Sequence, residues 1–383
     1  MNNQYLSSIT IENYFSIEKI ELSGLDKSKE IYFLGENGDG KTLVLQAILL
    51  ALTRGKFENP TEKINKEEIG KIEQYLSENS NYKSSGKITK SDFDFKGDNF
   101  FPKIYAYGAN RNKSTADFGG KNGFGKEGYL TLFDDNRALQ SPVQWLKDLK
   151  LEGLNAMISV DKAIKLLEEI LDNNVKISLE RSNVYFTERE TNNLSFEQLS
   201  DGFKSVMTWV ADLVARLASE HKNISKIQDF EGIVLVDEIN LHLHPKWERN
   251  LVKKLRTWFP KIQFFFTTHS PTMLLSASRD AIFYKIYKEN GHTKVDEPML
   301  CEKFANLQAN SLITSPLFDL ENAYMEAYDE KKNELDTSST YLENKIREIL
   351  REKKENQPKQ YMSEKEFDTI LNDTFEKYKN GTL

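Results

Sequence analysis

One octapeptide, GENGDGKT at residues 35–42, restricts the possible folds of this 383-residue chain more than any other feature. The apolar run IYFL directly precedes it, and the apolar run LVLQAILLAL follows it. Strand, glycine-rich loop and buried helix, in this order, are the context in which the pattern forms a phosphate-binding loop. The sequence therefore predicts an α/β fold whose loop turns backbone N–H groups toward phosphates at a helix N-terminus.

The same loop predicts a binding site for ATP and Mg²⁺. We expect Lys41 to reach the β and γ phosphates, as a catalytic as well as a binding residue, and the Thr42 hydroxyl to bind Mg²⁺. Asn37, Gly38 and Gly40 are further candidates for contact with the nucleotide.

Two later apolar runs end in side chains that can perform chemistry. The run Gly232–Val236 is followed by Asp237, which we expect to hold Mg²⁺, and by Glu238, which we expect to act as general base or to orient water for attack on the γ-phosphate. The run FFFTT ends at His269, where an imidazole can donate to a γ-phosphate oxygen. The alternatives are solvated acids that cap a strand and a structural histidine.

A fourth element, LSDGF, opens a run whose apolar residues recur at helical spacing. Leu199, Ser200, Asp201 and Gly202 are candidates for contact with the γ-phosphate, because a serine hydroxyl, an unhindered glycine backbone and a positive helix end suit an anion. Taken alone, the segment would be a helix N-cap. Its position shortly before the Asp-Glu pair favours the binding role.

These four elements, in this order, resemble the ABC ATPases. The opening ITIENYFSIEKIEL and the segment FLGENGDGKT look like the start of SMC, RecF and related heads. The segments EINLHLHP and TTHSP narrow the similarity to the RecF-like and OLD-like ATPases. The resemblance covers about residues 5–280. It implies an α/β fold of the ABC-type ATPase head: a P-loop NTPase with a parallel core sheet and an antiparallel N-terminal sheet.

The resemblance also implies a site shared between two copies of the chain. Ser200 and Gly202 of one subunit would complete the site around ATP held by Lys41 and Thr42 of the other. We therefore expect a homodimer or a higher homo-oligomer.

Two further segments are read through the same resemblance. The segment LSDGF corresponds to the family's signature and is called the signature below. It departs from the family's usual pattern, because Asp201 stands where Gly is normal and Phe203 where Gln or Lys is frequent. His242, His244 and Pro245 fall where relatives carry a loop that crosses the dimer interface.

Longer phrases resemble the ATPase subunits of bacterial anti-phage modules such as Septu and PARIS: KIYAYGANR, TLFDDNRALQSPVQWLKDL and SLITSPLF. This likeness implies a slow, regulatory AAA family ATPase that controls a separate effector, a nuclease or toxin. A RecF-like DNA-repair ATPase that clamps DNA is the alternative. The SMC-like opening argues against the energising subunit of a membrane transporter.

Charge gives little support to a nucleic-acid partner without excluding one, since the formal net charge is −7. The basic run Lys246–Arg256 is either a solvated helix face or a nucleic-acid contact. Arg54 and Arg111 are candidates for phosphate contact, with a structural role equally open.

Three features favour a cytoplasmic protein without membrane association. The single cysteine, Cys301, excludes an internal disulfide framework and is expected to be a packing residue. No basic-then-apolar leader opens the chain. The longest apolar stretch, Leu43–Leu52, is too short to span a bilayer.

The ATPase head is expected over residues 1–320, with insertions at about 55–85 and 112–193. We expect helix and loop in the first insertion and two helices and two strands in the second. No sustained heptad pattern predicts a coiled-coil arm. A hairpin turning at Asn290–Gly291 follows. Residues 321–383 are predicted to form a helical assembly segment with two amphipathic stripes, Leu342, Ile346, Ile349 and Leu350, then Phe367, Ile370, Leu371 and Phe375.

Overall fold

The computed structural model divides the chain into two compact units, Met1–Glu321 and Asn322–Leu383. Arg54, most of the first predicted insertion and residues 321–383 lie outside the described residues, so the expectations for them stay predictions. The structure describes residues 5–53, 83–88, 103–111, 113–115, 131–133, 138–181, 183–221, 224, 226–303, 315 and 317–318.

Parallel strands form the centre of the first unit, in the order β13, β3, β12, β11, β5. Every residue of β3, β11 and β12 is buried, and most are apolar, as is typical of a parallel sheet covered on both faces. The predicted parallel core sheet is confirmed. The bounds are Glu30–Leu34 (β3), Ile104–Tyr107 (β5), Gly232–Val236 (β11), Ile262–Thr268 (β12) and Ile282–Glu289 (β13).

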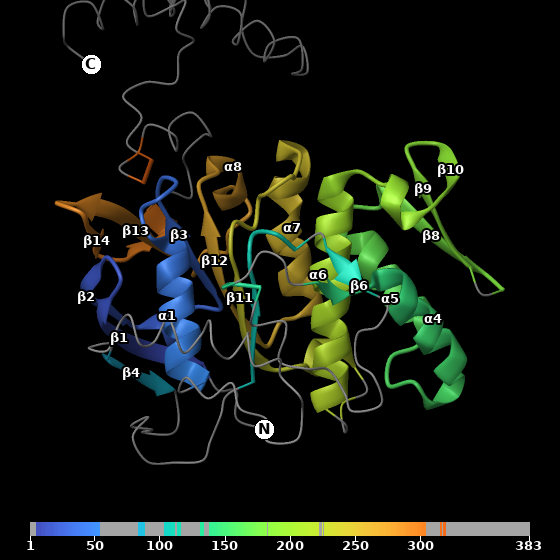
Figure 1. Ribbon diagram of the computed structural model, residues 1–383, viewed down its shortest axis with the longest axis horizontal. Helices are drawn as coiled ribbons and strands as arrows, with labels where there is room; N and C mark the ends of the chain where they lie inside the picture. Colours follow the sequence, from blue (N-terminus) through green and yellow to red (C-terminus); the bar gives the residue numbers. More distant parts are fainter. Residues whose placement is uncertain are drawn as a thin grey trace, which may run out of the picture. The chain divides into compact units, whose positions relative to one another are not determined.

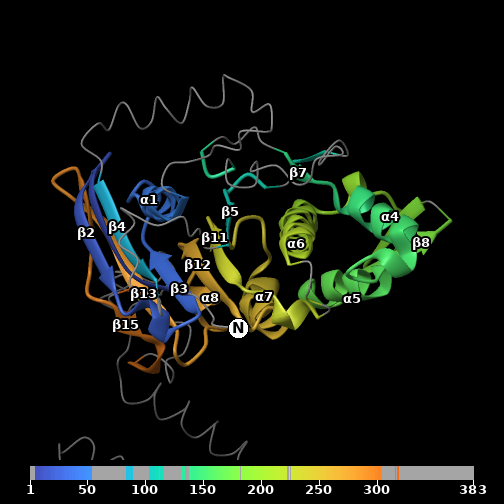
Figure 2. The same ribbon diagram turned by 90° about the horizontal axis from the view of Figure 1, so that it is seen from below.

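Alternate side chains of this sheet serve two separate cores. Ile31 and Phe33 of β3 face a core shared with α1 (Lys41–Thr53) and the N-terminal strands. Tyr32 and Leu34 face a second core. That core includes α6 (Asp201–Glu220) and α7 (Pro245–Trp258). Figure 1 and Figure 2 show α1 on one side of β11 and β12 and α6 on the other.

An antiparallel sheet, in the order β2, β1, β4, covers α1 on the side away from the core sheet. Its strands are Leu6–Tyr14 (β1), Ile17–Ser23 (β2) and Lys83–Ile88 (β4). The predicted N-terminal sheet is confirmed. Residues 83–85, which we expected in the first insertion, instead begin β4 and pair with β1. The polar sequence of β4 carries no apolar alternation, and only its pairing with β1 makes it a strand.

Two α-helices and three short strands form the segment between residues 141 and 194. Ser141 and Ser159 cap the two helices through their side chains. The predicted helices and the two predicted strands are confirmed, and β10 is an additional strand. The bounds are Pro142–Glu152 (α4), Val160–Ile170 (α5), Val175–Glu180 (β8), Asn183–Glu188 (β9) and Thr191–Leu194 (β10).

The remaining elements are short. Asn290 and Gly291 both have positive φ, as the predicted hairpin turn requires. Cys301 packs against the second core, as expected. The elements are Ser114–Thr115 (β6), Leu139–Gln140 (β7), Pro271–Leu274 (α8), His292–Val295 (β14) and Met299–Leu300 (β15).

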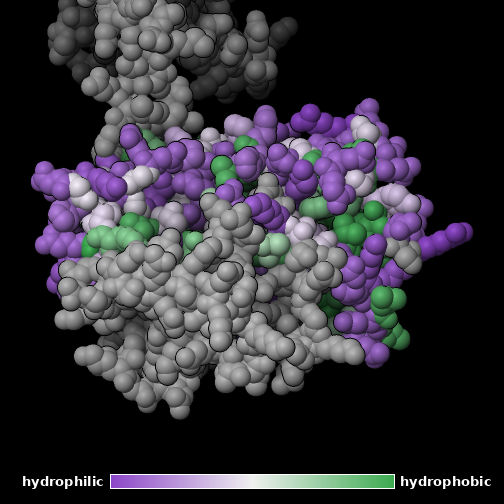
Figure 3. Space-filling model, viewed as in Figure 1, coloured by the Kyte–Doolittle hydropathy of each residue, from purple (hydrophilic) through white to green (hydrophobic). Residues whose placement is uncertain are grey.

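The described surface is mainly polar. Among the described residues, no helix is both long and apolar enough to cross a membrane. Figure 3 shows hydrophilic residues over most of the coloured part of one face. Leu151 and Leu154, at and just beyond the end of α4, are the most exposed large apolar side chains in the described part of the chain.

A buried ion pair joins α7 to the core sheet and generates a stability prediction. The Glu30 carboxylate is fully buried and accepts hydrogen bonds from Arg256, the Tyr32 hydroxyl (3.3 Å) and the Ser278 amide (3.0 Å). Burial raises the pKa of Glu30, although the charge of Arg256 opposes the rise. We expect Arg256→Leu to lower the free energy of unfolding by about 3 kcal/mol at pH 7, because it leaves a buried charge without its partner.

The pH dependence of this loss has a definite sign. In Arg256→Leu the folded-state pKa of Glu30 rises further above the unfolded value of about 4.3. The destabilisation is therefore small below about pH 4 and grows as the pH rises toward neutrality. Urea unfolding at several pH values measures it, with Lys253→Leu on the exposed face of α7 as control. An equal loss at acidic and neutral pH would contradict the assignment.

Candidate nucleotide-binding site

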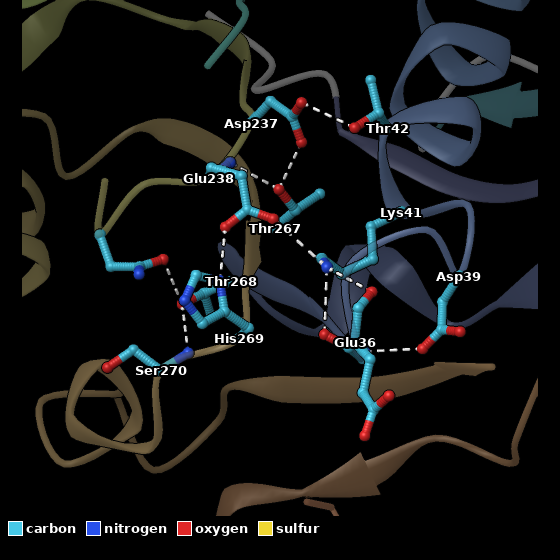
Figure 4. Close-up of polar contacts among 12 residues, drawn as sticks. Glu36, Asp39, Lys41, Thr42, Asp237, Glu238, Thr267, Thr268, His269 and Ser270 are labelled. Carbon is cyan, nitrogen blue, oxygen red and sulfur yellow. Dashed lines mark hydrogen bonds and ion pairs between the residues drawn. The ribbon is translucent and has the colours of Figure 1, made fainter. Parts of the chain in front are cut away.

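The loop between β3 and α1 has the conformation that its glycines predict. Gly38 and Gly40 adopt positive φ values of 93° and 100°, which residues with a Cβ rarely adopt. Lys41 is buried and its Nζ donates to the carbonyl oxygens of Gly35 (3.0 Å) and Glu36 (2.9 Å) (Figure 4). The lysine thus lies folded over the loop at the start of α1.

Thr42 and Asp237 meet across the end of the core sheet. The Thr42 hydroxyl donates to Asp237 Oδ2 at 2.8 Å (Figure 4). Burial raises the pKa of Asp237, while hydrogen bonds from Thr267 and Thr42 oppose the rise. A hydroxyl and a carboxylate in contact are the oxygen ligands that Mg²⁺ prefers, so the predicted pair fits this ion.

Glu238 lies at the centre of the site in a conformation that costs backbone strain. Its φ is 43°, in the left-handed region that non-glycine residues rarely adopt. Its carboxylate lies 3.3 Å from Lys41 Nζ and 2.9 Å from His269 Nδ1. Strain of this kind persists where the surroundings over-determine the residue, and it is characteristic of functional sites.

Thr267, at the end of β12, is a site residue that sequence reasoning missed. Its hydroxyl donates to Asp237 Oδ1 and accepts from the Glu238 amide at 2.6 Å. One hydroxyl thus holds both the carboxylate of the first acid and the backbone of the second. The signal in the sequence was weak, because a threonine in an apolar strand is ordinary.

Arg111 has the structural role that the sequence left open, because its guanidinium binds backbone carbonyls. Its Nη1 donates to the carbonyls of Gly108 (2.8 Å) and Asp237, and its Nη2 donates to the carbonyl of Glu238 (2.8 Å). Burial lowers the pKa of Arg111 to about 10, so the group stays charged at neutral pH. It fixes the backbone that carries both acids.

The signature segment lies away from these residues. Leu199 is buried in the second core, so its side chain contributes packing. Ser200 is the N-cap residue of α6, and its side chain makes no capping hydrogen bond. The Ser200 amide donates to Glu188 of β9 at 3.2 Å. α1 and α6 lie on opposite sides of β11 and β12, so the helix that the signature opens and the helix that follows the loop cover different faces of the sheet.

The two residues after Ser200 connect the signature to its surroundings. Asp201 pairs with Lys204 at 2.8 Å, and this hydrogen bond lowers the pKa of Asp201. A Cβ at Gly202 would lie 2.5 Å from the carbonyl oxygen of His242, so glycine is required there. His242 itself has a φ of 65°. The segment that follows Glu238 therefore touches the start of α6.

The basic run on α7 is partly used within the molecule. Lys254 lies 3.4 Å from Asp172, and Arg256 pairs with Glu30. Lys246, Arg249 and Lys253 are exposed. This division favours an ordinary helix face over a dedicated nucleic-acid surface.

Comparison with known proteins agrees with this geometry. A family model described as "AAA domain, putative AbiEii toxin, Type IV TA system" matches residues 124–276, which include the signature, both acids and His269. The Septu protein PtuA of Bacillus mycoides (strain KBAB4) is 29% identical over 334 residues, covering 83% of this chain and 45% of that protein. The chain is similar to Septu PtuA, and its parallel core sheet with an antiparallel N-terminal sheet is the fold expected of an ABC-type ATPase head. Its predicted likeness to Septu ATPases is confirmed.

Two other proteins are similar to this chain. The "Retron Ec83 probable ATPase" of Escherichia coli is 26% identical over 371 residues, covering 70% of this chain and 68% of that protein. A solved SMC head bound to the C-winged helix domain of ScpA gives a TM-score of 0.42 at 13% identity, covering 78% of this chain and 99% of that one. The chain spans less than half the length of the PtuA relative.

Thr267 generates a prediction for the head. In Thr267→Val the Glu238 amide loses its acceptor and Asp237 loses a donor, while the side-chain volume is kept. We expect the free energy of unfolding to fall by about 2 kcal/mol, because a buried donor is left unpaired. Thr267→Ser keeps the hydroxyl and should recover most of the loss. Chemical denaturation compares the three proteins, and equal stability of the valine and serine variants would contradict the role of the hydroxyl.

Proposed function

We propose that this chain binds and hydrolyses ATP with Mg²⁺, and that two copies enclose the nucleotide. The observation that carries the proposal is the convergence of Lys41, Thr42, Asp237, Glu238 and His269 at one end of the core sheet. These residues come from three separate segments. A lysine, an oxygen-ligand pair, a base and an imidazole are the groups that phosphoryl transfer to water requires.

Each residue has a defined role in this proposal. Lys41 binds the β and γ phosphates, and the loop amides orient them. Thr42 and Asp237 would hold Mg²⁺, which supplies charge neutralisation on the phosphate oxygens when bound. Glu238 accepts the proton of the attacking water or orients it. His269 donates to a γ-phosphate oxygen, and its contact with Glu238 fixes the carboxylate.

The signature would act on ATP held by a second copy. Two features support this arrangement: α6 begins on the far side of β11 and β12 from α1, and the exposed Ser200 hydroxyl makes no capping bond. The N-terminus of α6 is a favourable site for an anion. We propose that Ser200 and Gly202 face the γ-phosphate of the partner's ATP.

We further propose that the dimer controls a separate effector, a nuclease or toxin, in anti-phage defence. The similarity to Septu protein PtuA and to the retron ATPase supports this proposal. Slow hydrolysis would make the ATP-bound dimer a timed switch.

The role of Glu238 is tested by Glu238→Gln, which removes the base but keeps the shape. We expect hydrolysis to fall by about 100-fold or more, with ATP binding retained. Lys41→Ala should abolish binding. Steady-state phosphate release and equilibrium binding of labelled ATP give the two readouts, with Glu289→Gln on the exposed hairpin as control. Normal hydrolysis by Glu238→Gln would contradict its assigned role.

The Glu238→Gln protein also tests effector control. Affinity purification from the native host with ATP, followed by mass spectrometry, should recover a stoichiometric nuclease or toxin. Recovery of only DNA and repair factors would contradict the defence proposal and favour the RecF-like alternative.

The shared site is tested by mixing two inactive variants. Lys41→Ala abolishes ATP binding by the loop of one protomer. Ser200→Arg blocks the signature of the other protomer. A mixed dimer contains one site in which both mutations meet and one site that is intact. We expect each variant alone to be inactive and the mixture to regain up to about a quarter of wild-type turnover, since about half of random dimers are mixed and each has one of two sites. No recovery under conditions where mixed dimers form would contradict a shared site.

A further inference from the structure

The β13–β14 hairpin lies directly against the phosphate-binding loop. A Cβ at Gly35 would collide with the carbonyl oxygen of Ile286 in β13. A Cβ at Gly40 would lie 2.5 Å from the hydroxyl of Thr293 in β14. The hairpin therefore contacts both ends of the loop, although it lies more than two hundred residues later in the chain.

A chain of hydroxyl groups leads from the N-terminal sheet to the loop through Thr293. Thr293 is fully buried, and its hydroxyl donates to the carbonyl oxygen of Asp39 at 3.0 Å. The Ser16 and Thr293 hydroxyl oxygens are 2.7 Å apart. Since the carbonyl can only accept, the Thr293 proton is committed to Asp39, and Ser16 must donate to Thr293. The order of donation is thus Ser16 to Thr293 to Asp39.

This contact sets the direction of the Gly40 amide. In a trans peptide the C=O of one residue and the N–H of the next point in opposite directions. No described peptide bond is cis. The bond from Thr293 turns the Asp39 carbonyl toward the hairpin, so the Gly40 N–H points away from the hairpin. A loop binds phosphate through N–H groups turned inward in this way.

The turn at Ser16 also holds Thr293 through its backbone. The Thr293 amide donates to the Ser16 carbonyl at 2.8 Å, so Thr293 is held by backbone and side chain together. On the loop itself, the Asp39 carboxylate accepts from the Glu36 amide at 2.6 Å. Asp39 is therefore fixed at its side chain by the loop and at its carbonyl by the hairpin.

We propose that Thr293 is a positioning residue for nucleotide binding, which holds the Asp39–Gly40 peptide with its N–H turned toward the phosphates. The proposal rests on the proposed function, because it assumes that the loop binds ATP. Thr293 acts through this peptide and does not touch the nucleotide. Its substitution therefore changes ATP affinity more than the rate of the chemical step.

The test is made in the Glu238→Gln background, where binding is measured without hydrolysis. We expect Thr293→Val to weaken Mg-ATP binding by about tenfold, because the valine keeps the volume but cannot donate to the Asp39 carbonyl. Thr293→Ser restores the hydroxyl and should bind within about twofold of the parent protein. In the wild-type background, Thr293→Val should raise KM by a similar factor and leave kcat within about twofold.

A matched control separates positioning from general loss of structure. Tyr284 of β13 donates its hydroxyl to the Ser23 carbonyl at 3.2 Å, so Tyr284→Phe removes a hydrogen bond between the same hairpin and the same N-terminal sheet. This variant should keep the ATP affinity. Equal affinities of Thr293→Val and the parent would overturn the inference, as would equal weakening by Tyr284→Phe. Absence of ATP binding by the parent itself would instead overturn the proposed function.

Discussion

The parallel pairing of β3, β12 and β11 is the constraint on which the site depends. Leu34 of β3 pairs with Thr268 of β12, and Val236 of β11 pairs with Phe266. Because the strands run in one direction, the loop after Leu34, the acids after Val236 and His269 all leave the sheet at the same edge. No side chain in the site could reach its partners if one strand were shifted or reversed. The arrangement of the site is therefore a consequence of register.

Strain at Glu238 is offset by contacts from three directions. The left-handed backbone is held by Thr267 at the amide and by Arg111 at the carbonyl, while Lys41 and His269 hold the carboxylate. A residue in this region costs on the order of 1–3 kcal/mol, and these four contacts offset that cost. Arg111 contributes a full charge to backbone carbonyls, and charge-assisted hydrogen bonds are stronger than neutral ones. The carboxylate is thus held in place by the protein's own residues.

The sequence predicted the parts of the fold and site that local pattern determines. The loop, both acids and His269 come directly after apolar runs that are recognisable as strands. The continuous apolar run after the loop predicts α1, and the Asn290–Gly291 dipeptide predicts the turn. Three features could not be predicted, because each depends on contacts between distant residues. Arg111, which follows β5, binds the backbone carbonyl of Asp237, just after β11. Thr267 is a residue type that is ordinary in a strand. The polar β4 becomes a strand only by pairing with β1. The functional assignment of Arg111 stayed open for the same reason.

The phosphate-binding loop takes its shape from elements on both sides of it. Within the loop, the Asp39 carboxylate accepts from the Glu36 amide, while the Asp39 carbonyl is held by Thr293 and, through it, by Ser16. At two of the loop's glycines, Gly35 and Gly40, the hairpin approaches too closely for a Cβ. Flexibility in the unfolded chain and restriction in the folded one are therefore properties of the same residues. A ligand that binds only this folded loop must stabilise the hairpin and the N-terminal sheet as well, because the three share one set of hydrogen bonds.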